Sequence, residues 1–144
     1  SKAGEFVYDF PFLWGSKRTG PDVHRVGGKY NDNWHFNHMI DPRSTSPGSI
    51  MPRYPWLVKN DLDITNTVGK VNAMVKLVVP YSQFELDKAV YLLQNQAKEV
   101  ESNLRQDPDF VKNYGDSNIE NKEIVALIAY LQRLGTDINA ESAE

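Results

Sequence analysis

Three histidines in the first part of the chain have a spacing that could serve a metal site. His35 and His38 stand three residues apart on a segment expected to be helical, so both imidazoles can lie on one face. His24, in the preceding loop, offers a third ligand. No cysteine accompanies them, and hydrogen-bonding or core roles are the commoner use of histidines in such a pattern. A metal site therefore stays open as one interpretation.

Met51 is the residue whose role decides between interpretations. It follows Ile50 in a loop that contains Pro47, Pro52 and Pro55. As an ordinary core residue, a methionine beside an isoleucine fills an irregular gap. Alternatively, the proline-braced loop presents the thioether sulfur to a haem iron, a task that needs a rigid backbone because the ligand is weak.

Composition and charge exclude several functional classes. The chain has 16 basic and 19 acidic residues, a net charge of -3 and no basic cluster, so nucleic acid is not an expected partner. It has no cysteine, which excludes disulfides, thiolate nucleophiles and thioether attachment of haem within these residues. No catalytic triad, phosphate loop or dinucleotide fingerprint stands out. No apolar run approaches the roughly 20 residues of a membrane helix, so any anchor is expected outside this sequence.

The elements that must position these residues differ between the two halves of the chain. Residues 1–60 hold every histidine and tryptophan and many prolines and glycines, so we expect ordered loops there. One short helix is predicted over residues 31–40, with Trp34 and His38 facing inward, and Asp41-Pro42 should end it. A second irregular loop is expected over residues 43–57.

Residues 61–134 show the periodicity of amphipathic helices. We predict one helix over residues 62–80 and a second over 82–105, which begins with a capping box of Ser82 and Glu85. Gln106-Asp107-Pro108 should end the second helix, and a polar linker with Asn113, Gly115, Asp116, Ser117 and Asn118 should precede the last element. The last helix is predicted over 121–134, with Gly135 at its C-terminal cap and an apolar stripe along one face. The stripe comprises Ile124, Leu127, Ile128, Leu131 and Leu134.

Several segments, taken in order, resemble the class I cytochromes c after their haem-attachment helix. They are GPDV at residues 20–23, HMIDP at 38–42, SPGSIMP at 46–52 and EIVALIAYL at 123–131. More narrowly, YDFPFLWGSKRTGPD at 8–22 and SIMPRYPWL at 49–57 resemble signatures of the mono-haem subunit of cbb3-type cytochrome c oxidases. KVNAM at 70–74 and VPYS at 79–82 extend the likeness over nearly the whole chain.

The resemblance implies roles for individual residues. Met51 would be the distal axial ligand of a c-type haem, and Pro21 would pack beside the proximal histidine. His38 would lie near the methionine sulfur and tune the reduction potential of the haem. The remaining candidates are Arg18, Arg25 and Arg43 as propionate partners, and Trp34, Tyr54 and Trp56 as the pocket wall.

The resemblance also implies a fold and a function. We expect a mainly α, class I cytochrome c-like domain over residues 1–137: haem-facing loops and a short helix at 1–60, a helical insertion at 61–116, a C-terminal helix at 117–137, and a tail at 138–144. Its function would be one-electron transfer toward an oxygen-reducing subunit, with no catalytic residue of its own. The expected partners are the catalytic haem–copper subunit and a di-haem cytochrome c subunit, on the periplasmic side of a bacterial inner membrane.

The motif that attaches haem in that family, Cys-x-x-Cys-His, is not in these residues. We expect the motif and a single membrane helix upstream, and we expect these 144 residues alone to lack haem. The apolar stripe at 124–134, without its usual helical neighbour, would then be partly uncovered and favour self-association. The alternative is a haem-free helical interaction module, with or without metal on its histidines.

Overall fold

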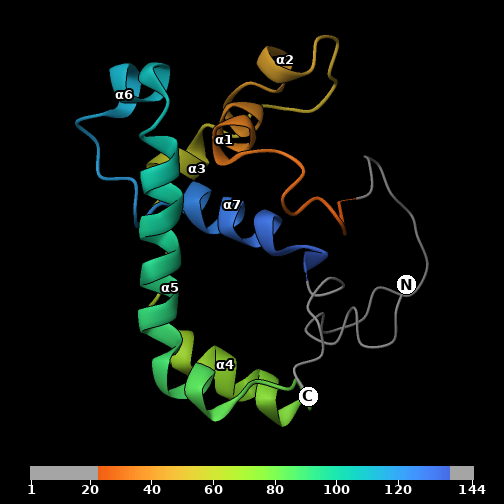
Figure 1. Ribbon diagram of the computed structural model, residues 1–144, viewed down its shortest axis with the longest axis vertical. Coiled ribbons are helices and arrows are strands. Elements are labelled where there is room, and N and C mark those ends of the chain that lie inside the picture. The colour runs from red at the N-terminus through yellow and green to blue at the C-terminus, as the bar shows by residue number, and fades with distance from the viewer. Residues whose placement is uncertain (1–22, 137–144) are drawn as a thin grey trace.

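Seven α-helices account for the regular structure of residues 23–136, the part of the chain that this computed structural model describes (Figure 1). Within these residues no β-strand forms, and Asp61 and Lys122 make an isolated antiparallel bridge. The mainly α, cytochrome c-like fold class is therefore confirmed. The helices are α1 (Asp32–Ile40), α2 (Pro42–Thr45), α3 (Trp56–Lys59), α4 (Thr67–Lys76), α5 (Gln83–Leu104), α6 (Pro108–Tyr114) and α7 (Glu123–Arg133).

The helix ends form where capping residues satisfy free backbone groups. Asn31 caps α1, its side chain accepting a hydrogen bond from the Trp34 N–H at 2.8 Å. The predicted capping box of Ser82 and Glu85 is present at the start of α5. Gly135 follows α7 with a φ of 78°, the left-handed conformation that glycine adopts without steric cost. These predicted boundaries are confirmed.

The polar linker predicted with Gly115, Asp116, Ser117 and Asn118 is present, but a short helix that the sequence did not predict, α6, begins at Pro108 and includes Asn113. The Asp107 side chain accepts from the Asp109 N–H at 2.9 Å, and Pro108 occupies the first turn, where its missing N–H is no loss. The Asp-Pro pair thus begins a helix, after α5 has already ended at Leu104. Asp41 and Pro42 do likewise at α2, and α3 is a further short helix that begins at the end of the loop predicted over residues 43–57. The helix predicted at 62–80 is shorter in the structure, where α4 covers only Thr67–Lys76.

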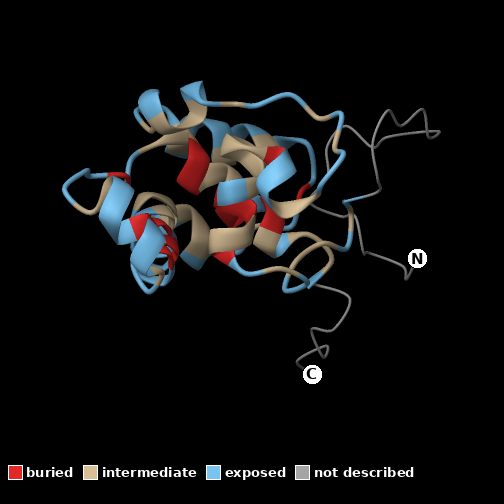
Figure 2. Ribbon diagram, turned by 90° about the horizontal axis from the view of Figure 1, so that it is seen from above, coloured by how far each residue is buried: buried red, intermediate tan, exposed pale blue. Residues whose placement is uncertain are grey.

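The hydrophobic core lies where α1, α6 and α7 pack around the C-terminal part of α5 (Figure 2). Phe36 of α1 meets the rings of Phe110 and Tyr114 edge to face, with ring centroids 5.1 and 5.2 Å apart. Leu104 and Ile128 are fully buried within this cluster. The core therefore includes residues from the C-terminal half of the predicted insertion.

The α4 helix and the N-terminal half of α5 form a hairpin that extends away from this core (Figure 1). No residue of α4 is buried, and on α5 burial begins only at Ala97. Val79, in the turn between the two helices, is buried. We call residues 67–96 the hairpin.

A polar cluster joins α1, α5 and α7 at one edge of the core. Asp32 is buried, and its carboxylate accepts from the Asn103 side-chain amide at 2.8 Å and from that of Gln132 at 2.6 Å. Gln132 also donates to the Tyr30 carbonyl oxygen at 2.9 Å. Because a buried carboxylate is stable only when hydrogen-bonded, these contacts fix the start of α1 against the other two helices.

The C-terminal helix is better covered than the sequence suggested. Ile124, Ile128 and Leu131 of its stripe are buried, and α7 packs on α5, α1 and α3. Leu127 and Leu134 are half-buried, so the stripe is more covered than expected, and its self-association stays a prediction. Within residues 23–136, no helix is both long and apolar enough to cross a membrane.

Candidate functional site

Residues 43–54 carry Met51, and we call them the methionine loop. This loop is attached at both ends to the C-terminal turn of α1. At its start, the Asp41 carboxylate accepts from the Arg43 N–H at 3.3 Å and so caps α2. At its end, the Arg53 guanidinium forms two hydrogen bonds to the same carboxylate, at 3.1 and 2.7 Å. The Tyr54 N–H donates to the Met39 carbonyl oxygen at 2.9 Å. The loop is therefore closed on itself, and Met51 lies two residues from an anchored position.

Within the loop, the methionine and its neighbour are exposed to different degrees. Ile50 is 94% exposed, whereas Met51 is half-buried and its N–H donates to the Ser49 hydroxyl at 3.2 Å. Hydrophobicity alone would favour the opposite choice, because isoleucine is among the residues most often buried. The loop thus keeps the sulfur-bearing side chain against the protein and leaves the aliphatic one in solvent.

A row of stacked rings lies along α1. Tyr30 stacks on Trp34 with centroids 3.9 Å apart, and Trp34 stacks on His38 with centroids 4.5 Å apart. His38 Nδ1 is hydrogen-bonded to the Thr45 hydroxyl at 2.5 Å, which ties the row to α2. Trp34 and His38 were predicted to face inward and are half-buried. The structure therefore brings two of the candidate residues together, on the helix that also anchors the methionine loop.

His35, rather than His38, is the fully buried histidine of α1. It is 2% exposed, its ring meets Trp34 edge to face at 5.4 Å, and its Nε2 atom has no hydrogen-bond partner among residues 23–136. Burial lowers the pKa of His35; Asp32 opposes this shift and His38 adds to it. Burial also lowers the pKa of His38. Both imidazoles are therefore favoured in the neutral form.

These shifts predict how stability depends on pH. Because the folded pKa of His35 lies below its unfolded value of about 6.5, the unfolded chain takes up a proton first as the pH falls. The free energy of unfolding should then decrease below about pH 6.5, by at most about 1.4 kcal/mol per pH unit for this group. Denaturant unfolding between pH 7.5 and 5.5 measures this, and His35→Phe should flatten the profile. An equal slope in the variant would contradict the assignment.

The other candidates are distributed over several elements. Tyr54 and Trp56 meet edge to face with centroids 5.2 Å apart, and Trp56 is 47% exposed. Arg43 is exposed on α2, whereas Arg25 is exposed in the segment that lies against Gly135, just beyond α7. Arg18 and Pro21 lie outside the described residues. Residue types alone gave no reason to single out Arg53, and its two-residue spacing from Met51 was the only available signal.

The described residues fit a haem better than a metal ion held by side chains alone. No group of three histidine, cysteine, aspartate or glutamate side chains within residues 23–136 could hold a metal, so His24, His35 and His38 do not form a joint site. The iron of a haem is already coordinated by the four nitrogens of its porphyrin ring and needs only axial ligands from the protein. One half-buried methionine on an anchored loop, Met51, is a candidate for such a ligand.

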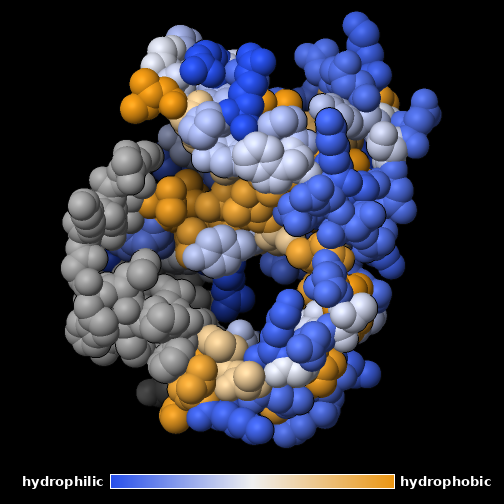
Figure 3. All heavy atoms as spheres, turned by 180° about the vertical axis from the view of Figure 1, so that it is seen from behind, coloured by the Kyte–Doolittle hydropathy of each residue, from blue (hydrophilic) through white to orange (hydrophobic). Residues whose placement is uncertain are grey.

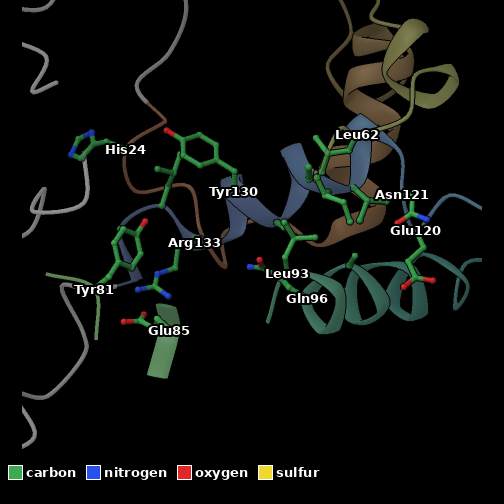
Figure 4. Close-up of a pocket in the computed structure, with 17 residues that line it drawn as sticks. His24, Leu62, Tyr81, Glu85, Leu93, Gln96, Glu120, Asn121, Tyr130 and Arg133 are labelled. Carbon is green, nitrogen blue, oxygen red and sulfur yellow. The ribbon is translucent and has the colours of Figure 1, made fainter. Parts of the chain in front are cut away.

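A separate pocket of about 450 Å³ lies between α5 and α7 (Figure 4). Leu62, Leu93 and Val125 contribute to its apolar wall, and Glu85 and Arg133 lie at one end. Apart from His24, no candidate metal-ligand or haem-pocket residue named from the sequence lines this pocket. The candidate site therefore lies at α1 and the methionine loop, and not between α5 and α7.

Comparison with known proteins points to one family. No curated protein sequence matches the chain significantly. The sequence model of one family, described as cytochrome c oxidase, mono-haem subunit/FixO, matches residues 1–138, which include α1, the methionine loop and all seven helices. The chain therefore belongs to the FixO family of mono-haem cytochrome c oxidase subunits.

Proposed function

We propose that this protein is the electron-transfer subunit of a cbb3-type terminal oxidase and passes single electrons through a c-type haem toward the oxygen-reducing catalytic subunit. The observation that carries the proposal is the half-buried Met51 on a loop anchored to α1 by Arg53 and Tyr54. Membership of the FixO family supports the same conclusion. The haem, when bound, supplies a one-electron redox centre.

The protein's own residues bind and orient that group. Met51 would provide the distal sulfur ligand, and the Arg53–Asp41 pair would restrain the loop that carries it. The ring row of Tyr30, Trp34 and His38 would form an apolar wall of the pocket. Tyr54 and Trp56 would extend this wall, with Arg18, Arg25 and Arg43 as propionate partners and Pro21 on the proximal side.

No bond-making side chain is needed for this role. Electron transfer requires only that the redox group be held, shielded from water and brought close to its partners. His38 would act on the redox potential through the environment of the methionine sulfur, with its Nδ1 atom held by Thr45. The protein is then a part of an oxidoreductase complex without being the site of oxygen reduction.

The partners and location belong to the same proposal. Family membership places the chain in a cytochrome c oxidase complex. We propose that its neighbours there are the catalytic haem–copper subunit and a di-haem cytochrome c subunit. The domain would lie on the periplasmic side of the membrane. Because these residues contain no cysteine, covalent attachment of haem would depend on residues outside them, and on their own they would lack haem.

A kinetic comparison tests the function directly. Full-length protein is matured with haem, reduced and mixed with oxygen, once alone and once in the assembled oxidase. In the complex the haem absorbance should return to the oxidised form at a typical enzyme turnover rate, about 1–1,000 per second. The isolated subunit should reoxidise far more slowly, because it has no site for oxygen reduction. Equal rates in the two samples would contradict the proposal.

A further inference from the structure

The turn between α4 and α5 contains an unusual backbone conformation. The Val79 N–H donates to the Met74 carbonyl oxygen at 3.1 Å, and the Val78 N–H donates to the Val75 carbonyl oxygen at 2.9 Å. This pair of bonds is the Schellman motif, which places one residue in the left-handed region. That residue is Val78, with a φ of 65°, and it is the only non-glycine residue with positive φ within residues 23–136.

Valine is a poor choice for this position unless its side chain has a use. Glycine adopts the left-handed conformation freely, whereas a β-branched residue there is strained. Burial within the chain gives no compensation, because the Val78 side chain is 86% exposed. The buried contact of the motif is made instead by Val79, which is 4% exposed. A strained residue without an internal contact points to a contact outside the chain.

Other apolar side chains are exposed beside it. Leu77 precedes Val78 and is 45% exposed, and Phe84 in the first turn of α5 is 62% exposed. We call Leu77, Val78 and Phe84 the hairpin tip. Apolar residues gather at the end of the molecule where α4 lies (Figure 3). The hairpin has little core of its own, since Val79 is the only buried residue in it.

The charge of the hairpin favours a protein partner over a lipid surface. The charge of residues 67–92 is nearly balanced: it comes from three lysines, Lys70, Lys76 and Lys88, and two carboxylates, Glu85 and Asp87. Binding to an anionic membrane surface relies on clusters of four to eight basic residues. Exposed apolar residues with nearly balanced charge are instead typical of a protein–protein contact.

We propose that the hairpin tip docks on an apolar surface of another subunit of the oxidase. The inference rests on the proposed function, which supplies a multisubunit complex, and it goes further by naming the surface. The contact buries Val78 and Phe84 and uses the strained turn to project the valine. It lies on the hairpin, away from the anchored methionine loop.

Site-specific photocrosslinking in the assembled complex tests the contact. A benzophenone side chain is introduced into the full-length protein at position 78, and separately at position 84. Val111 on α6, an apolar residue that is 45% exposed, is the matched control position. We expect adducts with another oxidase subunit from 78 and 84 and none from 111. Adducts with lipid alone, or none from either hairpin position, would overturn the proposal.

Val78→Gly separates docking from folding. Glycine relieves the left-handed strain, so the melting temperature of the variant should be equal to or above that of the parent. Loss of one buried valine side chain should nevertheless weaken association with the rest of the oxidase by about tenfold. Phe84→Ala should weaken it as well, and Val111→Ala should not. Unchanged association of both hairpin variants would overturn the proposal.

The haem spectrum distinguishes failure of this inference from failure of the proposed function. Val78→Gly should keep the haem content and reduced spectrum of the parent, because the hairpin is remote from the methionine loop. Normal spectra with unaltered assembly would refute the docking surface alone. A parent protein that binds no haem when fully matured would refute the function, whatever the crosslinks show.

Discussion

Replacing Met51 with leucine is expected to remove the proposed axial sulfur ligand while leaving the fold intact. Leucine has nearly the same volume as methionine, so the half-buried site keeps its packing. It has no sulfur, however, and methionine ligation raises the potential of a haem iron. The haem of the full-length variant should therefore lose its low-spin, methionine-ligated signature almost completely, and its reduction potential should fall. Visible absorption spectroscopy and a redox titration measure the two effects.

Met74→Leu on α4 is the matched control for this experiment. It makes the same chemical change at a half-buried position on the hairpin, outside the anchored loop. The spectrum of this variant should be that of the parent. A parental spectrum in the Met51 variant, or the same loss in both variants, would remove Met51 from its role as the ligand.

Leu104→Ala is expected to cause a large loss of stability. Leu104 is fully buried at the end of α5, in the cluster that joins Phe36, Phe110 and Ile128. Removing its side chain loses apolar contacts and leaves a cavity among three helices. Such substitutions lower the free energy of unfolding by about 2–5 kcal/mol. Denaturant unfolding followed by circular dichroism gives this difference.

Leu92→Ala is the comparison on the same helix. Leu92 is 36% exposed and lies in the hairpin half of α5, so its replacement should lower the free energy of unfolding by less than about 1 kcal/mol. Similar losses in the two variants would mean that the core is not concentrated at the C-terminal end of α5.

Much of the fold could be predicted because its helix boundaries are determined locally. The Ser82–Glu85 capping box and Gly135 each act within one helical turn, so they can be read from neighbouring residues. Short helices behave differently: α6 has seven residues, too few to show a periodic pattern, and its Asp-Pro start resembles a terminator. The packing of the last helix also depends on partners far along the chain.

The candidate site could be predicted only in part for a similar reason. Met51 stands out because prolines constrain its loop and because its sulfur has a distinct chemistry. Which histidine of α1 is buried depends on the rotation of a nine-residue helix, which Phe36 sets by packing on Phe110. That rotation buries His35 and leaves His38 beside Trp34. Residue order alone does not reveal it.

The length of α5 has a consequence for how the complex could be organised. The helix rises by about 20 Å between Gln83 and Ala97, where it enters the core. It therefore acts as a rigid spacer between the hairpin tip and the helices that carry the methionine loop. With the proposed docking contact at one end and the proposed haem site at the other, substitutions at the contact should alter subunit affinity without altering the environment of the electron carrier.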